Sequence, residues 1–203
     1  MIRRLKSCFF VLLILSTVPG RADEHPPVDA ESLKKMAAGE YVVLERRPDE
    51  TDTLDHRFVT VGAIIEGTQR EIWEVINDKE HAADFIDGVL ESKVLEREGN
   101  RILVEQRTQV GGPKGSYRYR LTHQLTPMTR ADFTYSGGEL RDVIGSWWIF
   151  EGTAPSNHLV VYSLHIDPGF LAPQLVVKSG MKKSMPGTIR SIAREVLRRR
   201  TRE

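Results

Sequence analysis

The chain has 203 residues, of which 40% are hydrophobic and 28% charged, a composition and length that suit one domain with a real core. Its 29 Lys and Arg nearly balance 28 Asp and Glu, and the net charge becomes −3 if residues 1–22 are removed, which takes away the main support for generic nucleic-acid binding. The single cysteine, Cys8, lies in the first segment, so the rest of the chain has neither disulfide nor thiol chemistry.

Residues 1–22 have the pattern of a secretory signal peptide. The basic stretch MIRRLK is followed by the apolar run CFFVLLIL and then by small residues, with a predicted cut after Ala22. The alternative is an uncleaved membrane anchor, but the apolar run is far shorter than the ~20 residues that span a bilayer. We therefore expect export to the periplasm or beyond. Cleavage would remove four Lys and Arg and no acid, leaving a formal net charge of −3.

Residues 23–55 are predicted to form a leader before the main domain. A short helix is expected over Asp29–Ala38, with Asp29 as its N-cap. The apolar patch Tyr41–Leu44 resembles a short strand, and a charged loop follows it. The main domain is expected to run from His56 to the end of the chain at residue 203.

The main domain opens with a strand and two short helices. Residues 57–67, RFVTVGAIIEG, are rich in β-branched side chains and predict a strand. Thr68 followed by Glu71 forms the capping-box signal of a helix start, and the apolar spacing of residues 72–76 continues it. A second short helix is expected to end at Gly88.

About six antiparallel strands are predicted next. Residues 89–110 form a hairpin that turns at Gly99–Asn100, because apolar and charged positions alternate on both sides. Further strands are expected within residues 116–127, 131–139, 145–152 and 157–169, and the first of these alternates strictly. One face of that strand carries, in order, Tyr117, Tyr119, Leu121, His123 and Leu125, and the arginines Arg118 and Arg120 belong to the other face.

The last segment predicts a long helix. Met185, Ile189, Ile192 and Val196 recur at helical spacing, and the pair Pro186–Gly187 is expected to kink or divide the helix. Strands segregated from helices indicate an α+β domain rather than alternating βαβ units.

The sequence resembles the START-like (SRPBCC) superfamily, in its polyketide cyclase/dehydrase and coenzyme Q-binding branch. The opening helix and the short helix after it match at Trp73, Ile76, Asp78 and Phe85. Later strands and the C-terminal segment match at Trp148, Phe150, Val160, Tyr162, Leu164, Pro168 and Pro173. The resemblance covers roughly residues 56–200 and depends on the order of these motifs, because no single one is specific.

The resemblance implies the helix-grip fold, in which a curved antiparallel sheet of about six to seven strands wraps around a long C-terminal helix and leaves an internal cavity. It also implies that a hydrophobic small molecule binds there, such as a lipid, sterol, isoprenoid or polyketide-like ring. The side chains that we expect to line the cavity are Phe85, Tyr117, Tyr119, Phe133, Tyr135, Trp148, Phe150, Tyr162, Met181 and Met185. By strand parity Trp147 should then face away from the cavity. A solid core without a cavity is the alternative.

The sequence gives little support for catalysis. The six histidines have no metal-ligand spacing, no G-x-S-x-G nucleophile motif is present, and the glycine-rich stretch Val110–Ser116 lacks P-loop spacing. No metal, cofactor or catalytic residue is therefore predicted. His123 shares the face of the tyrosines, and we interpret it as a hydrogen-bonded strand histidine. An inward-facing ionisable residue would instead favour a cyclase or dehydratase acting on a bound aromatic precursor.

The C-terminal helix is strongly basic, with Lys and Arg greatly outnumbering Glu after Gly169. One interpretation is transient docking on an anionic membrane surface during ligand exchange. The other is a solvated face of a helix whose apolar side is buried. The function predicted is thus that of an exported carrier or chaperone for a hydrophobic ligand. The alternatives are an enzyme, or a partner-binding module that uses its outer surface and the basic helix.

Overall fold

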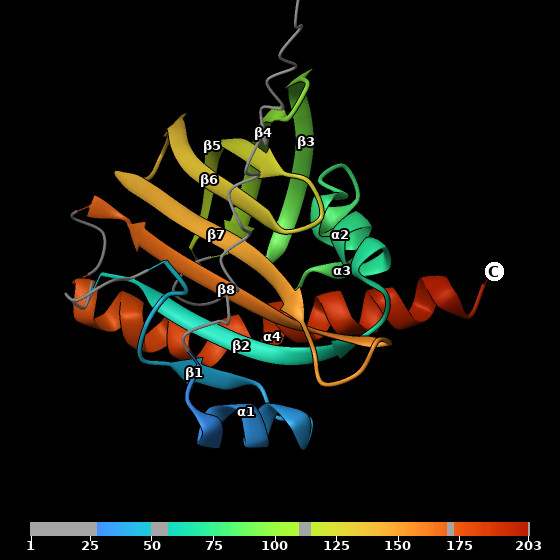
Figure 1. Ribbon diagram of the computed structural model, residues 1–203. Helices are drawn as coiled ribbons and strands as arrows, with labels where there is room; N and C mark the ends of the chain where they lie inside the picture. Colours follow the sequence, from blue (N-terminus) through green and yellow to red (C-terminus); the bar gives the residue numbers. More distant parts are fainter. Residues whose placement is uncertain (1–27, 50–56, 110–114, 170–172, 203) are drawn as a thin grey trace, which may run out of the picture.

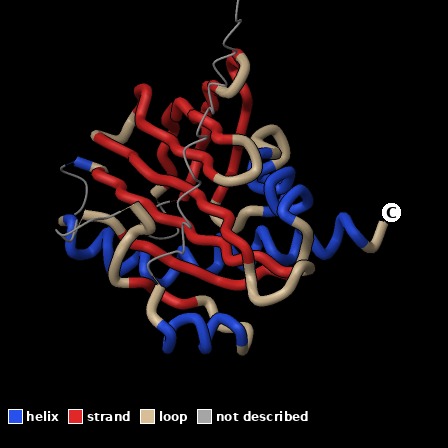
Figure 2. The backbone as a smooth tube through the Cα atoms, viewed as in Figure 1, coloured by secondary structure: helices blue, strands red, loops and turns tan. Residues whose placement is uncertain are grey.

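The computed structural model describes residues 28–49, 57–109, 115–169 and 173–202. The predicted signal segment, residues 1–22, His56 and most of the glycine-rich loop lie outside these ranges. Figure 1 and Figure 2 show the helices and strands, which are α1 (Ala30–Ala37), β1 (Val42–Leu44), β2 (Val59–Glu66), α2 (Gln69–Asn77), α3 (Ala82–Phe85), β3 (Val89–Glu98), β4 (Arg101–Gln109), β5 (Ser116–Thr126), β6 (Arg130–Gly138), β7 (Asp142–Glu151), β8 (Asn157–Asp167) and α4 (Gln174–Arg200).

The strands form one curved antiparallel sheet in the order β1-β2-β8-β7-β6-β5-β4-β3. Helix α4 crosses one face of the sheet, against β2 and β8 (Figure 1). This arrangement confirms the predicted α+β helix-grip fold. The sheet has eight strands instead of six to seven, because β1 of the leader pairs with β2, Val42 opposite Gly62 and Leu44 opposite Thr60.

Local sequence signals explain the elements that open the domain. Thr68 caps α2, its side chain accepting from the backbone N–H of Glu71, while the Glu71 carboxylate accepts from the backbone N–H of Thr68 at 2.6 Å. The reciprocal pair is the predicted capping box, and it satisfies two amides at the start of the helix. Between β3 and β4 the chain turns at Gly99, whose φ of 53° is in the left-handed region that glycine tolerates.

Helix α4 is a single helix of 27 residues, so Pro186 does not divide it. Its predicted apolar face is fully buried, with Met185, Ile189 and Val196 each at most 2% exposed. The proline removes one hydrogen bond to the carbonyl of Lys182, which is an exposed residue. Burial of the apolar face on both sides of Pro186 outweighs that loss, because tertiary packing supplies most helix stability in proteins.

The other face of the sheet has a smaller core beneath α1. Met36 of α1 packs there with Trp148, Leu159 and Val161, so the leader helix covers part of the sheet. The helix begins as predicted, with the Asp29 carboxylate accepting from the backbone N–H of Ser32 at 2.8 Å. Of the helices described, none is long and apolar enough to cross a membrane.

Strand β3 forms one edge of the sheet. Its pairing with β4 shifts twice, between Val89 and Glu91 and again between Val94 and Glu96. The residues skipped by these shifts are Leu90 and Leu95, and both side chains are exposed. The edge strand is therefore irregular at two places along its length.

Candidate functional site

The two adjacent tryptophans of β7 lie on opposite faces of the sheet. Trp147 is directly opposite Tyr162 of β8, and both belong to the main core that contacts α4. Trp148 is opposite Val161 and packs in the smaller core beneath α1, where Phe150 also lies. Residues directly opposite in an antiparallel pair share a face. The prediction that Trp148 and Phe150 line the interior is therefore wrong, and Trp147 faces inward instead.

A series of ring contacts crosses the inner face of the sheet. The His123 and Phe133 ring centroids are 5.5 Å apart, and those of Phe133 and Tyr162 are 6.4 Å apart. Tyr162 then stacks on Trp147, with centroids 3.9 Å apart and an interplanar angle of 12°. The inner wall is thus largely aromatic from β5 to β8, a surface that suits a ligand made mostly of hydrocarbon or rings.

Gly145 makes this arrangement of rings possible. A Cβ atom at this position would lie 2.2 Å from the Cζ atom of Phe133 and 2.5 Å from the carbonyl oxygen of Ser163. Both distances are far below van der Waals contact, and Phe133 is directly opposite Gly145 in the ladder. The Phe133 ring therefore lies over the β7 backbone and reaches the Tyr162 ring on the strand beyond.

The other predicted lining residues lie on the inner side. Tyr119, Phe133, Tyr162, Met181 and Met185 are buried in the main core, and Phe85, Tyr117 and Tyr135 pack against it. The Tyr135 hydroxyl lies 2.8 Å from the carbonyl oxygen of Gly138 and 2.7 Å from that of Leu140, so it holds the turn after β6. The Tyr119 hydroxyl accepts a hydrogen bond from Thr108 at 3.0 Å, and burial raises the pKa of Tyr119.

His123 is buried on the inner face without the hydrogen bond that we expected. Its side chain is 4% exposed, and neither ring nitrogen has a partner among the described residues. Burial, and secondly the positive charge of Lys79, hold the pKa of His123 well below its usual value. The ring is therefore neutral near pH 7 and offers one donor and one acceptor. Nearly all buried polar groups are paired, which makes this histidine exceptional.

Lys79, in the short connector between α2 and α3, is the second buried basic group. It is 6% exposed, and its Nζ atom donates to the carbonyl oxygen of Ile76 at 2.7 Å. Burial is the main cause that lowers the pKa of Lys79 to about 7; Arg97 adds to the effect and Asp78 opposes it. Lysine is rarely buried without a charged partner, so this side chain is a candidate functional group.

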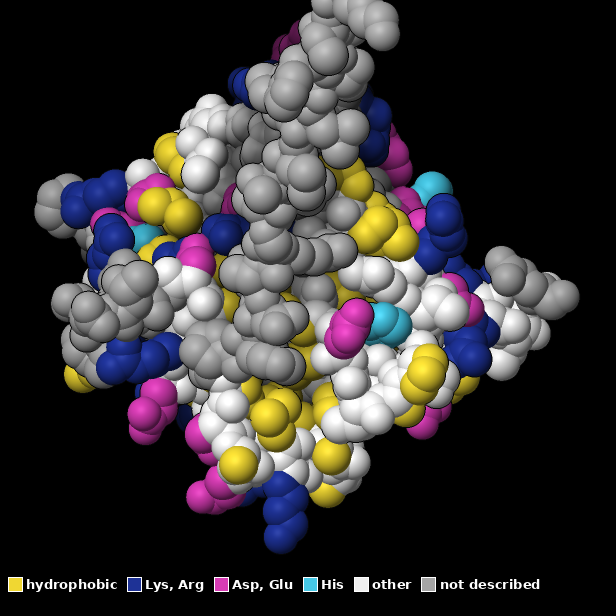
Figure 3. All heavy atoms as spheres, viewed as in Figure 1, with side chains coloured by type: hydrophobic (Ala, Val, Ile, Leu, Met, Phe, Trp, Pro, Cys, Tyr) yellow, Lys and Arg dark blue, Asp and Glu magenta, His cyan; other side chains and the backbone are white. Residues whose placement is uncertain are grey.

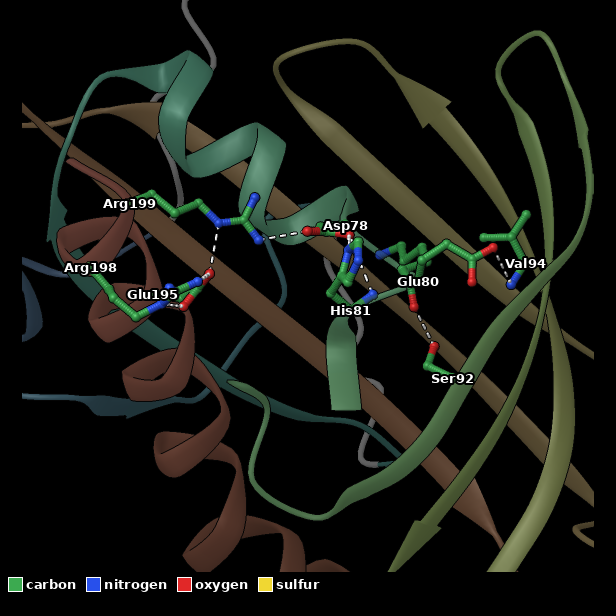
Figure 4. Close-up of polar contacts among 9 residues, drawn as sticks. Asp78, Glu80, His81, Ser92, Val94, Glu195, Arg198 and Arg199 are labelled. Carbon is green, nitrogen blue, oxygen red and sulfur yellow. Dashed lines mark hydrogen bonds and ion pairs between the residues drawn. The ribbon is translucent and has the colours of Figure 1, made fainter. Parts of the chain in front are cut away.

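The connector is fixed on both sides by polar contacts (Figure 4). On the β3 side, the Ser92 hydroxyl donates to the carbonyl oxygen of Lys79 at 2.6 Å, and the backbone N–H of Val94 donates to Glu80 at 3.2 Å. On the α4 side, Asp78 lies 2.7 Å from the His81 ring and 2.6 Å from the guanidinium of Arg199. Lys79 is consequently held between these two sets of contacts.

Glu195 anchors the α4 side of this network (Figure 4). Its carboxylate receives hydrogen bonds from Arg198 at 2.5 Å and from Arg199 at 2.7 Å, although the side chain is only 4% exposed. Arg198 is the main cause that lowers the pKa of Glu195 to about 2, with Arg199 adding to it and burial opposing it. Much of the basic end of α4 is thus engaged in ion pairs.

Arg118 and Arg120 face outward, as their parity predicted. Arg118 pairs with Glu91 and Glu105, and Arg120 with Glu105. They line an open surface depression of about 560 Å³, where glutamates balance the arginines. Basic and acidic side chains are also interspersed over the face seen in Figure 3. No group of three His, Cys, Asp or Glu side chains within the described ranges is arranged to hold a metal ion.

A family model described as "Polyketide cyclase / dehydrase and lipid transport" matches residues 65–193, more than half of the chain. The chain belongs to this family. The match spans the inner wall, the connector with Lys79, and most of α4. It confirms the resemblance seen in the sequence. No curated protein matches the chain at a significant level.

Several solved structures share the fold of this chain. An aromatase/cyclase from Streptomyces sp. R1128 is 14% identical, covers 70% of this chain and 94% of its own, and has a TM-score of 0.61. A STAR-related lipid transfer protein from Xanthomonas axonopodis is 9% identical, with 77% and 98% covered and a TM-score of 0.61. Human StAR-related lipid transfer protein 5 is 12% identical, with 83% and 94% covered and a TM-score of 0.60.

Sequence reasoning missed Lys79 and Trp147 and undervalued His123. The alternation of β5 did place His123 inward, but no pattern in the sequence indicates that its nitrogens lack partners. Lys79 follows a helix end in a polar stretch, where a lysine is ordinarily exposed. Only the packing of the connector between β3 and α4 reveals its burial.

Proposed function

We propose that this chain binds a hydrophobic small molecule between the inner face of its sheet and α4, and serves as its carrier or chaperone. The observation that carries the proposal is the buried aromatic wall, which ends at His123, whose two ring nitrogens have no partner in the described part of the chain. Burying about 300 Å² of ligand surface would contribute about 7 kcal/mol at ~25 cal/mol per Å². A polar group on the ligand would satisfy His123.

The first test is to identify what the protein carries. The chain is purified from its own host and examined by native mass spectrometry and by organic extraction. We expect a hydrophobic molecule to copurify in a ratio near one per chain. Absence of any such molecule, together with no binding of added lipids or aromatic acids, would contradict the proposal.

The adjacent tryptophans provide a matched control for the place of binding. A ligand beside Trp147 should change the fluorescence of that residue, because its ring lies in the inner wall. The change should therefore be smaller in Trp147→Phe and kept in full in Trp148→Phe, since Trp148 lies beneath α1 whereas Trp147 and Trp73 adjoin the main core. The reverse pattern would place the ligand on the opposite face of the sheet, beneath α1, and would contradict the proposed site.

A second candidate function is a cyclase or dehydratase reaction, favoured by the two buried basic groups. Lys79, with a pKa of about 7, is suited to move a proton at neutral pH, and the neutral His123 ring can donate a hydrogen bond to a reacting group or accept one from it. Incubation with a synthetic aromatic β-hydroxy ketone tests this candidate. Loss of water that depends on His123 supports the enzyme, and an unchanged substrate favours the carrier.

We also propose that the chain is exported after cleavage near Ala22, as its first residues indicate. N-terminal sequencing of protein from the periplasmic or extracellular fraction tests this. A mature chain that still begins at Met1 would contradict cleavage.

Membrane contact is proposed for the start of α4 rather than for its arginine-rich end, where Arg198 and Arg199 are in ion pairs. Leu175 is 81% exposed and Val176 61% exposed, and the exposed Lys182 and Lys183 follow about two turns along the helix. Apolar and basic groups together favour an anionic lipid surface. Cosedimentation with anionic vesicles should fall in Leu175→Glu and stay unchanged in Leu197→Glu.

A further inference from the structure

Two buried basic side chains lie on the inner side of the sheet, and no buried acid within the described ranges pairs with either of them. Lys79 comes from the α2–α3 connector and His123 from β5, and each is less than a tenth exposed. Among the buried residues that the structure describes, the acidic side chain is Glu195, which is committed to Arg198 and Arg199. The interior therefore has a local surplus of hydrogen-bond donors and positive potential.

Both basic groups retain unused hydrogen-bonding capacity. The His123 ring nitrogens have no partner within the described parts of the chain. Lys79 makes its one described side-chain hydrogen bond to the carbonyl oxygen of Ile76, whereas an ammonium has three donors. The two groups are also close enough for the charge of Lys79 to act on the His123 ring.

The backbone beside Lys79 is held by hydrogen bonds from neighbouring strands. A hydrogen-bonded sequence runs from the Gln106 amide to the Ser92 hydroxyl at 3.2 Å, and from that hydroxyl to the Lys79 carbonyl oxygen at 2.6 Å. Gln106 is directly opposite Tyr119, which lies four residues before His123 on the same face of β5. The connector, β3, β4 and β5 thus converge on one polar end of an otherwise aromatic interior.

We propose that the hydrophobic ligand carries an acidic oxygen group, such as a carboxylate, which docks on Lys79 and His123. The inference rests on the proposed binding function and adds the chemical class of the ligand. The buried ammonium of Lys79 would be stabilised by an anion, and charge-assisted hydrogen bonds are the stronger kind, while the neutral His123 ring can donate one hydrogen bond to the same group. A neutral alcohol would supply a hydrogen bond to His123 but no charge for Lys79.

Matched pairs of probes that differ only in this group test the inference. Oleic acid is compared with oleyl alcohol, and 2-naphthoic acid with 2-naphthalenemethanol, by calorimetric titration of the full mature chain at pH 7. We expect at least one acid to bind about tenfold or more tightly than its alcohol, which corresponds to about 1.4 kcal/mol.

Variants then assign the preference to the two residues. Lys79→Met should reduce the acid preference to less than about threefold, and a cooperative urea-unfolding transition shows that the variant is folded. His123→Phe should weaken the acid by a smaller factor. The matched control is Lys182→Met, an exposed lysine on α4, which should keep the full preference.

The possible results distinguish a failure of the acidic-ligand inference from a failure of the proposed binding function. Equal binding of acids and alcohols, or a preference that survives both Lys79→Met and His123→Phe, overturns the acidic-ligand inference alone. Binding of none of the four probes, with no copurifying molecule, overturns the binding function itself.

Discussion

Replacement of Lys79 by methionine should make the ligand-free protein more stable at neutral pH. Methionine fills a similar volume but places no charge in the interior, so the cost of burying an ammonium disappears. The replacement gives up the hydrogen bond to the Ile76 carbonyl oxygen, which is worth about 1 kcal/mol.

The size of the effect follows from the pKa of Lys79, which falls from the ordinary 10.5 to about 7 because the side chain is buried. The unfolded chain then binds more protons between these values, so unfolding free energy rises with pH across the window. Near pH 7 and below, the cost to the folded state is about 4 kcal/mol, and it vanishes above about pH 10.5. After the lost hydrogen bond, Lys79→Met should gain about 2–3 kcal/mol near pH 7.

Urea unfolding at pH 7.5 and pH 9.5 is the appropriate assay. Between these values the parent chain should gain about 2–3 kcal/mol relative to Lys79→Met. The exposed control Lys182→Met should follow the parent at both values. Two results would contradict this reasoning: Lys79→Met no more stable than the parent at pH 7.5, or an equal gain in unfolding free energy with pH for both proteins. Either would mean that burial does not disfavour the charged form of Lys79.

Three further substitutions test how packing and ion pairs stabilise the fold. Gly145→Ala should destabilise the chain by about 1–3 kcal/mol in urea unfolding, because its Cβ atom meets the Phe133 ring. The control Gly187→Ala in α4, with open space around the added methyl group, should be neutral or stabilising. Equal effects of the two substitutions would refute the packing argument. Glu195→Gln should lower stability at pH 7 by about 1–3 kcal/mol. Because the folded pKa of Glu195 is about 2, its contribution is present above pH 4.5 and lost as the pH falls toward 2, so the variant should show a flatter acid limb in a pH series of melting curves. Met36→Ala should cost about 2–5 kcal/mol by thermal unfolding if α1 is integral to the fold, and almost nothing if it is a loose leader.

Much of the fold follows from local sequence signals. The pair Thr68 and Glu71 predicts the start of α2, and the spacing of Met185 and Ile189 predicts the buried face of α4. Strict alternation in β5 places Tyr119 inside and Arg118 outside. Each of these predictions concerns neighbours within a few residues along the chain, where helix and strand periodicity determines the orientation of side chains.

The faces of β7 could not be assigned in this way. Trp147 and Trp148 are both large and apolar, and the sheet has a core on each of its faces, so alternation of polarity gives no direction. Pairing with Tyr162 decides the matter, and pairing is a contact between distant parts of the chain. The burial of Lys79 depends likewise on the packing of the connector between β3 and α4.

The two register shifts of β3 bear on how the protein behaves at high concentration. An open sheet presents unpaired backbone groups at each edge, and a regular edge is a template for pairing with another molecule. Here one edge strand, β1, has only three residues. The other, β3, is interrupted at Leu90 and Leu95 and carries charged side chains along most of its length. Both edges thus oppose growth of the sheet from one molecule into the next, which lowers the tendency of the protein to aggregate.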